Sequence, residues 1–181
     1  LNPGSSAVAS CHAFVVYKIV TKSSGATLIE VPTIDWGHNL EAFPANIRDD
    51  TKVIFIANPN NPTGTYNSHQ EVHCLLKNIP SSILVVLDCA YFEYVKKSNY
   101  VNPLPLLNEF DNLLVTKSFS KIQGLASARI GYGIGQPELI EVLNRIRQPF
   151  NVNSFAQELA CEAINDKEHI KKSIDLNLTE G

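Results

Sequence analysis

The residues that decide the fold are Asn112-Leu113-Leu114-Val115-Thr116-Lys117-Ser118-Phe119-Ser120-Lys121. The apolar run Leu113–Val115 predicts a short buried strand, which leads into a hydroxyl-rich turn that ends on a lysine. A lysine that is isolated in sequence is usually a solvated surface residue. Here it follows a core strand and lies near hydroxyls and a second cation, Arg129, so it is suited to form a Schiff base with an aldehyde. Lys121 is therefore the first candidate for a catalytic residue.

On both sides of this stretch, apolar runs alternate with segments of helical periodicity. Strands are predicted at Ala26–Val31, Val53–Ala57, Ile83–Leu87, Leu113–Val115 and Ala128–Ile134. Helices are predicted at Ala13–Thr21, Leu40–Ile47, Ser68–Ile79, Leu104–Phe110, Pro137–Ile146, Phe155–Ile164 and Lys167–Leu178. This alternation predicts an α/β fold, a three-layer α/β/α sandwich with a mainly parallel sheet. We expect residues 1–164 to form one large domain and residues 165–181 to begin a smaller C-terminal domain.

Composition narrows the class of function. The chain has 181 residues, of which 44% are hydrophobic and 18% charged, and a formal net charge of -3. This composition is typical of a globular domain. Because the chain has no run of basic residues, the sequence predicts no positively charged surface for binding nucleic acid. No window is apolar enough for a membrane span, and no secretion signal is recognisable at the amino terminus. We therefore expect a cytoplasmic protein that acts on small molecules and has no nucleic-acid or membrane partner.

The cysteines and histidines do not predict a metal site. The four cysteines are widely spaced, and we expect Cys89 and Cys161 to be buried free thiols. His69 and His73 lie four residues apart, as in zinc proteases, but Gln70 replaces the glutamate that such a site needs.

Three glycines near the end of the predicted sheet, Gly131, Gly133 and Gly135, lack the spacing of a dinucleotide-binding loop. We expect them to allow close packing of strands.

Four polar side chains fall at the carboxyl ends of predicted strands. They are Asn61, Asp88, Tyr91 and Lys121. In an open parallel sheet these ends meet at one edge, where ligands bind. Each residue alone has an ordinary explanation as a turn former, a strand-end carboxylate or a solvated side chain. Their convergence at one edge predicts a binding site.

Three motifs, in this order and spacing, resemble those of the class II aminotransferases of fold type I. The motifs are Asn58-Pro59-Asn60-Asn61-Pro62-Thr63-Gly64, Asp88-Cys89-Ala90-Tyr91, and Ser118-Phe119-Ser120-Lys121 continuing to Arg129. Within this family the chain is most similar to the histidinol-phosphate aminotransferases. The resemblance implies a pyridoxal 5'-phosphate (PLP) cofactor, an amino donor and a 2-oxo acid as substrates, and a homodimer with shared active sites.

The resemblance also implies roles for individual residues. Lys121 would form the Schiff base with PLP and carry protons, and Asp88 would pair with the pyridine nitrogen. Asn61 and Tyr91 would bind the phenolic oxygen. The phosphate would be bound by Ser118, Ser120 and Arg129, and Phe14 would stack on the ring.

By the same resemblance, the reaction would be transamination of histidinol phosphate with 2-oxoglutarate, giving imidazole acetol phosphate and glutamate. The alternatives are another aminotransferase, for aromatic or aspartate-type substrates, a PLP-dependent threonine-phosphate decarboxylase, and a PLP-binding regulator. We expect the chain to be part of a longer protein, because it contains no methionine and resembles only the middle of the family's sequence.

Overall fold

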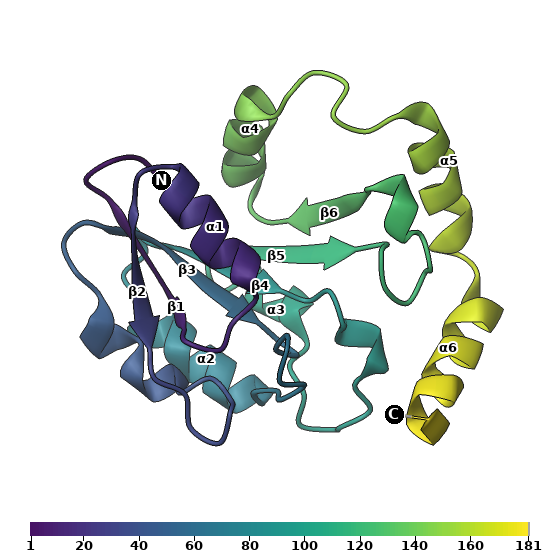
Figure 1. The fold of residues 1–181 in the computed structure, drawn as a ribbon, viewed down its shortest axis with the longest axis horizontal. Coiled ribbons are helices and arrows are strands. Elements are labelled where there is room, and N and C mark those ends of the chain that lie inside the picture. The colour runs from purple at the N-terminus through teal and green to yellow at the C-terminus, as the bar shows by residue number, and fades with distance from the viewer. Residues whose placement is uncertain (181) are drawn as a thin grey trace.

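The structure, a computed structural model, describes residues 1–180. Its centre is a six-stranded sheet in the order β2-β1-β3-β4-β5-β6 (Figure 1). The first five strands in this order are parallel, and β6 pairs with β5 in the antiparallel direction. The bounds are β1 Ser6–Ser10, β2 Thr27–Val31, β3 Thr51–Ala57, β4 Leu84–Asp88, β5 Leu113–Ser118 and β6 Gly131–Ile134.

Helices cover both faces of this sheet. On one face, α2 (His69–Asn78) and α3 (Pro103–Leu106) pack on a large apolar cluster that contains Ile54 and Ile56. On the other face, α1 (Val15–Ser23) packs on a smaller cluster around Tyr17 (Figure 1). Because successive strand side chains point to opposite faces, β3 supplies residues to both clusters. The predicted α/β sandwich with a mainly parallel sheet is confirmed.

Three further helices follow the last strand. They are α4 (Pro137–Ile146), α5 (Ser154–Ala163) and α6 (Lys167–Glu180). In Figure 1 they form the green to yellow part of the ribbon, which leads from β6 to the carboxyl end. A hydrogen bond of 2.9 Å between His169 Nε2 and the Ile122 carbonyl connects α6 to the turn after β5.

Several predicted elements differ from the observed ones. The strand β1 was missed, because Ser6-Ala7-Val8-Ala9-Ser10 is short and rich in small residues, yet all five are buried. The helix expected at Leu40–Ile47 is two short 3₁₀ turns, Leu40–Ala42 and Pro44–Asn46, since Pro44 cannot donate a backbone hydrogen bond. The last strand begins at Gly131, and Ala128 belongs to the 3₁₀ turn Ala126–Ala128.

Other local predictions are confirmed. Ser68 caps α2, and its hydroxyl and the Glu71 side chain form the expected capping box. Gly131 allows β6 to lie close to β5, because a Cβ atom at this position would come within 2.6 Å of the Lys117 carbonyl oxygen. None of the helices within residues 1–180 is both long and apolar enough to cross a membrane.

The cysteine prediction is correct for one thiol and wrong for the other. Cys89 is fully buried after β4, and burial raises the pKa of its thiol to about 12. Cys161 is exposed on α5, because the buried face of that helix is formed by Ala156 and Ala160.

Candidate active site

A pocket opens at the carboxyl edge of the sheet, where β3, β4 and β5 end. Its lining contains five of the predicted site residues, Phe14, Asn61, Asp88, Tyr91 and Lys121, together with Ala57, Pro59 and Ala90. About 320 Å³ of the pocket is free of protein atoms, part of it open to solvent. The pocket is therefore small and partly open to solvent.

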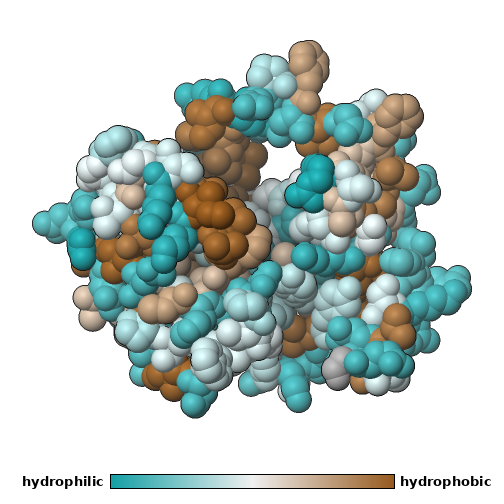
Figure 2. Space-filling view, in the orientation of Figure 1, coloured by the Kyte–Doolittle hydropathy of each residue, from teal (hydrophilic) through white to brown (hydrophobic). Residues whose placement is uncertain are grey.

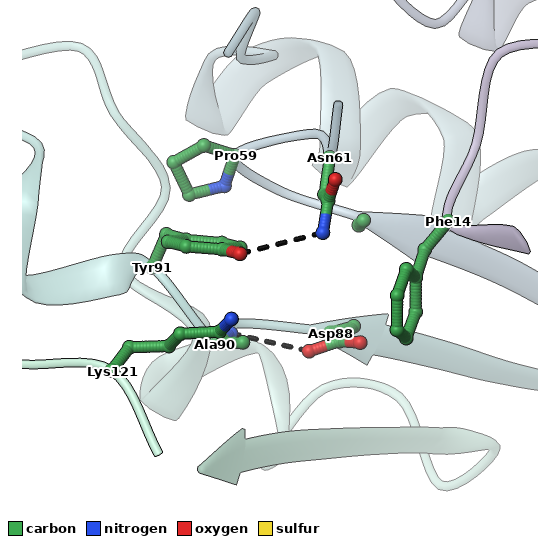
Figure 3. Close-up of a pocket in the computed structure, with 8 residues that line it drawn as sticks. Phe14, Pro59, Asn61, Asp88, Ala90, Tyr91 and Lys121 are labelled. Carbon is green, nitrogen blue, oxygen red and sulfur yellow. Dashed lines mark hydrogen bonds between the residues drawn. The ribbon is translucent and has the colours of Figure 1, made fainter. Parts of the chain in front are cut away.

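Asp88 is positioned by the register of the sheet. It is the last residue of β4 and pairs with Ala57 of β3 and Thr116 of β5. Its Oδ1 accepts a hydrogen bond of 3.1 Å from the backbone N–H of Ala90, and its Oδ2 accepts one of 2.8 Å from the Tyr17 hydroxyl. The carboxylate is thus held at both oxygens beside the pocket, and Figure 3 shows the hydrogen bond from Ala90.

Asn61 and Tyr91 face each other across the pocket. The Asn61 amide donates a hydrogen bond of 3.3 Å to the Tyr91 hydroxyl (Figure 3). The loop that carries Asn61 is fixed by Asn58, whose side chain makes two 2.9 Å hydrogen bonds with the Asn67 backbone. Gly64, at φ +71°, closes this loop with a conformation that residues with a Cβ atom rarely adopt.

Lys121 lies in a tight turn directly after β5. The Ser120 N–H donates to the Ser118 hydroxyl at 3.0 Å, and the Gly124 N–H donates to the Lys121 carbonyl at 2.9 Å. The ammonium lies 5.0 Å from the centroid of the Tyr91 ring, which is within the range of a cation–π contact. Figure 3 shows the side chain extending into the pocket toward Ala90 and Asp88, opposite Phe14.

The three residues predicted to bind phosphate adjoin Lys121 but do not line the same pocket. Ser120 lines a neighbouring cavity that also includes Lys121, Asn61 and Tyr91. Arg129 contacts the Ser120 hydroxyl at 3.4 Å and donates to the Ala126 carbonyl at 2.7 Å. Ser118, Ser120 and Arg129 therefore form a hydroxyl- and cation-rich region next to the lysine.

Two buried residues near the site were missed by the sequence analysis. Tyr17 touches Asp88 from behind the pocket. His38 shares hydrogen bonds with the Ser10 hydroxyl (2.6 Å at Nδ1) and the Ala57 carbonyl (2.8 Å at Nε2). Tyr17 could have been found, because it lies three residues after Phe14, a spacing at which side chains near a helix start can meet. His38 lies in an irregular segment with no periodic signal.

The residues around the pocket fit the functional groups of PLP. An amine is available for an aldehyde, a carboxylate for a pyridine nitrogen, and an amide and a phenol for a phenolic oxygen. Phe14 supplies an aromatic wall, and Ser118, Ser120 and Arg129 supply hydroxyls and a cation for a phosphate. Each group of the cofactor has a chemically matched partner within the described residues.

A lysine and a carboxylate at the carboxyl edge of a mainly parallel sheet indicate the α/β transferases that bind an aldehyde cofactor. The chain belongs to the aminotransferase class I and II family, whose profile matches residues 1–180. It is 50% identical to a histidinol-phosphate aminotransferase 2 of Pseudomonas fluorescens over 98% of this chain and 48% of the relative. It is 48% identical to a histidinol-phosphate aminotransferase of Caldicellulosiruptor saccharolyticus, over 98% of this chain and 49% of that protein. The chain therefore spans about half the length of the curated relatives it matches.

Solved structures share the fold. The crystal structure of histidinol-phosphate aminotransferase from Sinorhizobium meliloti in complex with pyridoxal-5'-phosphate superimposes with a TM-score of 0.91 at 28% identity. That match covers 96% of this chain and 47% of the other. A mutant aspartate aminotransferase of Thermus thermophilus superimposes with a TM-score of 0.86 at 22% identity, over 97% of this chain and 47% of the other, which supports the fold alone.

Proposed function

We propose that the protein containing this chain is a PLP-dependent histidinol-phosphate aminotransferase. It would convert histidinol phosphate and 2-oxoglutarate to imidazole acetol phosphate and glutamate. The convergence of Lys121, Asp88, Tyr91 and Asn61 on one pocket carries the assignment of the chemistry. The choice of substrate is supported by relatives of about 50% identity, which carry the name of this enzyme.

The chain's own residues would divide the work of the reaction. PLP, when bound, supplies an electron-accepting ring that stabilises negative charge on the carbon bearing the donor's amino group. Lys121 would hold the cofactor through its amine and move a proton at that carbon. Asp88 would hold a proton at the pyridine nitrogen, since a fixed carboxylate stabilises the protonated ring.

The remaining residues would orient the cofactor. Asn61 and Tyr91, already hydrogen-bonded to each other, would donate to the phenolic oxygen. Phe14 would pack against the ring, and Ser118, Ser120 and Arg129 would bind the phosphate. Together these residues would supply a partner for the ring, the phenolic oxygen and the phosphate of PLP.

A half-reaction screen of the full-length protein tests this function. The PLP-loaded enzyme is mixed with single amino donors, and its conversion to the pyridoxamine phosphate form is followed by absorbance. We expect histidinol phosphate to convert it far more efficiently than phenylalanine or aspartate do. Preference for either amino acid would indicate another aminotransferase, and release of carbon dioxide from threonine phosphate would indicate the decarboxylase.

In the full-length protein, we further propose, residues 1–164 belong to the large domain and residues 165–181 begin the small one.

We also propose that the full-length protein is a homodimer. Large apolar side chains after β6 support an interface there, because Ile146, Phe150 and Phe155 are 74%, 97% and 82% exposed. Figure 2 shows apolar surface over α1 and beside α4. On α1 the exposed side chains are Val15, Val16, Ile19 and Val20.

A further inference from the structure

The Tyr17 hydroxyl is the one side-chain donor to the Asp88 carboxylate among the described residues. It donates to Oδ2 over 2.8 Å, while the backbone N–H of Ala90 donates to Oδ1 over 3.1 Å. Tyr17 is 6% exposed and does not line the pocket, so it lies behind the carboxylate as seen from the pocket. Any influence of this tyrosine on a ligand would therefore act through Asp88.

Packing holds the Tyr17 ring in place. It stacks on Phe55 of β3 with 4.8 Å between ring centroids and an interplanar angle of 6°, and it meets Phe14 edge-on at 5.8 Å. Phe14 itself lines the pocket. Because the ring is held by its neighbours, the hydroxyl stays at one position relative to Oδ2.

The hydroxyl can act only as a donor to this carboxylate. Burial, followed by the negative charge of Asp88, raises the pKa of Tyr17 well above its ordinary value. The phenol therefore keeps its proton at any pH at which the protein works. A hydrogen bond to a charged acceptor stabilises the ionised carboxylate more than the neutral acid.

We propose that Tyr17 is a positioning residue for the reaction, which orients the Asp88 carboxylate and stabilises its negative charge through a hydrogen bond, opposite the pyridine nitrogen of PLP. This inference rests on the proposed function, because it assigns the pyridine nitrogen to Asp88. It adds a residue from α1 to a site built otherwise from strand ends and the loops that follow them. A buried tyrosine that serves packing alone would act on stability and leave the cofactor unaffected.

The test compares the full-length protein with its Tyr17→Phe variant. Phenylalanine keeps the ring between Phe55 and Phe14 and removes only the hydroxyl. Tyr66→Phe is the matched control, since its hydroxyl donates to Asn99 on the surface. Each protein is loaded with PLP carrying ¹⁵N in the ring, and the ¹⁵N chemical shift reports whether the pyridine nitrogen is protonated.

We expect the wild type and Tyr66→Phe to show a protonated nitrogen, and Tyr17→Phe to shift toward the unprotonated form. The half-reaction with histidinol phosphate should slow about tenfold in Tyr17→Phe, the rate equivalent of about one hydrogen bond to a charged group. N-methyl-PLP has a ring nitrogen with a permanent positive charge. When both proteins are loaded with it, Tyr17→Phe should react at the same rate as the wild type.

Each other result has a distinct meaning. An unchanged ¹⁵N shift in Tyr17→Phe, or a rate defect that persists with N-methyl-PLP, would overturn the role of Tyr17 and leave the proposed function intact. Wild-type protein that binds PLP but reacts with no amino donor would overturn the reaction, while the ¹⁵N comparison would still decide the role of Tyr17. A wild type that binds no PLP would overturn both.

Discussion

Lys121 and Asp88 meet in one pocket, although 33 positions separate them in the chain (121 − 88). Asp88 ends β4 and Lys121 follows the neighbouring parallel strand β5, so the sheet brings the amine and the carboxylate to the same edge. At the scale of single residues, the site is a set of strand-end groups whose chemistry is complementary to one cofactor.

Replacing Lys121 with alanine should remove the covalent attachment of PLP. The variant should show no adduct after borohydride reduction, and its transamination rate should fall by about 10⁴-fold or more, because Lys121 both binds the cofactor and moves the proton. Mass spectrometry of the reduced full-length protein measures the adduct. Lys97→Ala, at an exposed position, is the control. A reducible adduct that survives in Lys121→Ala would assign the linkage to another lysine.

Replacing Asp88 with asparagine should leave PLP bound but slow transamination about 100-fold or more, since a neutral amide cannot stabilise the protonated ring. The amide oxygen can still accept from the Ala90 N–H while the amide NH2 donates to the Tyr17 hydroxyl oxygen, so the fold should be retained. Absorbance spectra and single-turnover rates separate the two effects. Asp111→Asn, a change at an exposed carboxylate, should have no effect. Near-normal turnover in Asp88→Asn would contradict the assigned role.

His38 should make stability depend on pH below neutrality. Burial lowers the pKa of His38 from 6.5, although its hydrogen bond to the Ala57 carbonyl partly opposes this. The unfolded chain therefore binds more protons than the folded one between the two pKa values. The contribution of His38 is complete above pH 6.5 and is lost as the pH falls toward the folded pKa.

Urea unfolding of the full-length protein between acidic and neutral pH measures this effect. The slope of unfolding free energy against pH should be smaller in His38→Gln than in the wild type. In His69→Gln, whose imidazole is exposed, the slope should equal that of the wild type. An equal slope in His38→Gln and the wild type would assign the pH dependence to other groups.

At the scale of elements, the antiparallel strand β6 depends on glycine. It pairs with the strand that leads to Lys121, and Ser118 lies opposite Gly131. The sequence analysis predicted close packing here but started the strand three residues too early, because hydropathy does not show where a 3₁₀ turn ends. Arg129, directly after that turn, adopts φ +52°, a left-handed conformation.

Replacing Gly131 with alanine should destabilise the protein by about 1–3 kcal/mol, because the new methyl group would overlap the Lys117 carbonyl and force the strands apart. Gly133→Ala is the matched control on the same strand. Its methyl group would meet the flexible end of Leu114 at 3.3 Å and the Val115 carbonyl oxygen at an ordinary contact distance of 3.9 Å, so its cost should be smaller. Chemical unfolding compares the two variants, and equal costs would show that the close approach at Gly131 does not limit stability.

At the scale of the whole molecule, the region after β6 leaves much of its apolar surface exposed. Phe150, in the loop between α4 and α5, is 97% exposed and has φ +55°. Monomeric proteins rarely leave large contiguous apolar surfaces uncovered. This exposure supports the proposed homodimer, which the resemblance to the family first implied.

Phe150→Asn should shift the full-length protein from dimer to monomer at low concentration. Asparagine tolerates the left-handed backbone and removes the apolar ring, so the fold should survive. Sedimentation velocity measures the equilibrium. Leu104→Asn, which changes an exposed apolar residue on α3, should sediment as the wild type does. A wild type that sediments as a monomer would overturn the proposed dimer.

The amino-acid sequence by itself determined the mainly parallel sheet and the strand-end motifs, because periodicity and turn composition are local properties of the chain. The resemblance of those motifs to a known family implied the roles of the eight candidate residues. Only the tertiary structure revealed the contact of Tyr17 with Asp88, the link from His38 to Ala57, and the separation of the Arg129 region from the main pocket. These features join residues far apart in sequence, and their geometry depends on how helices and strands pack. The hydropathy of Tyr17 predicts that it is buried, but the packing of α1 on the sheet decides which carboxylate its hydroxyl meets.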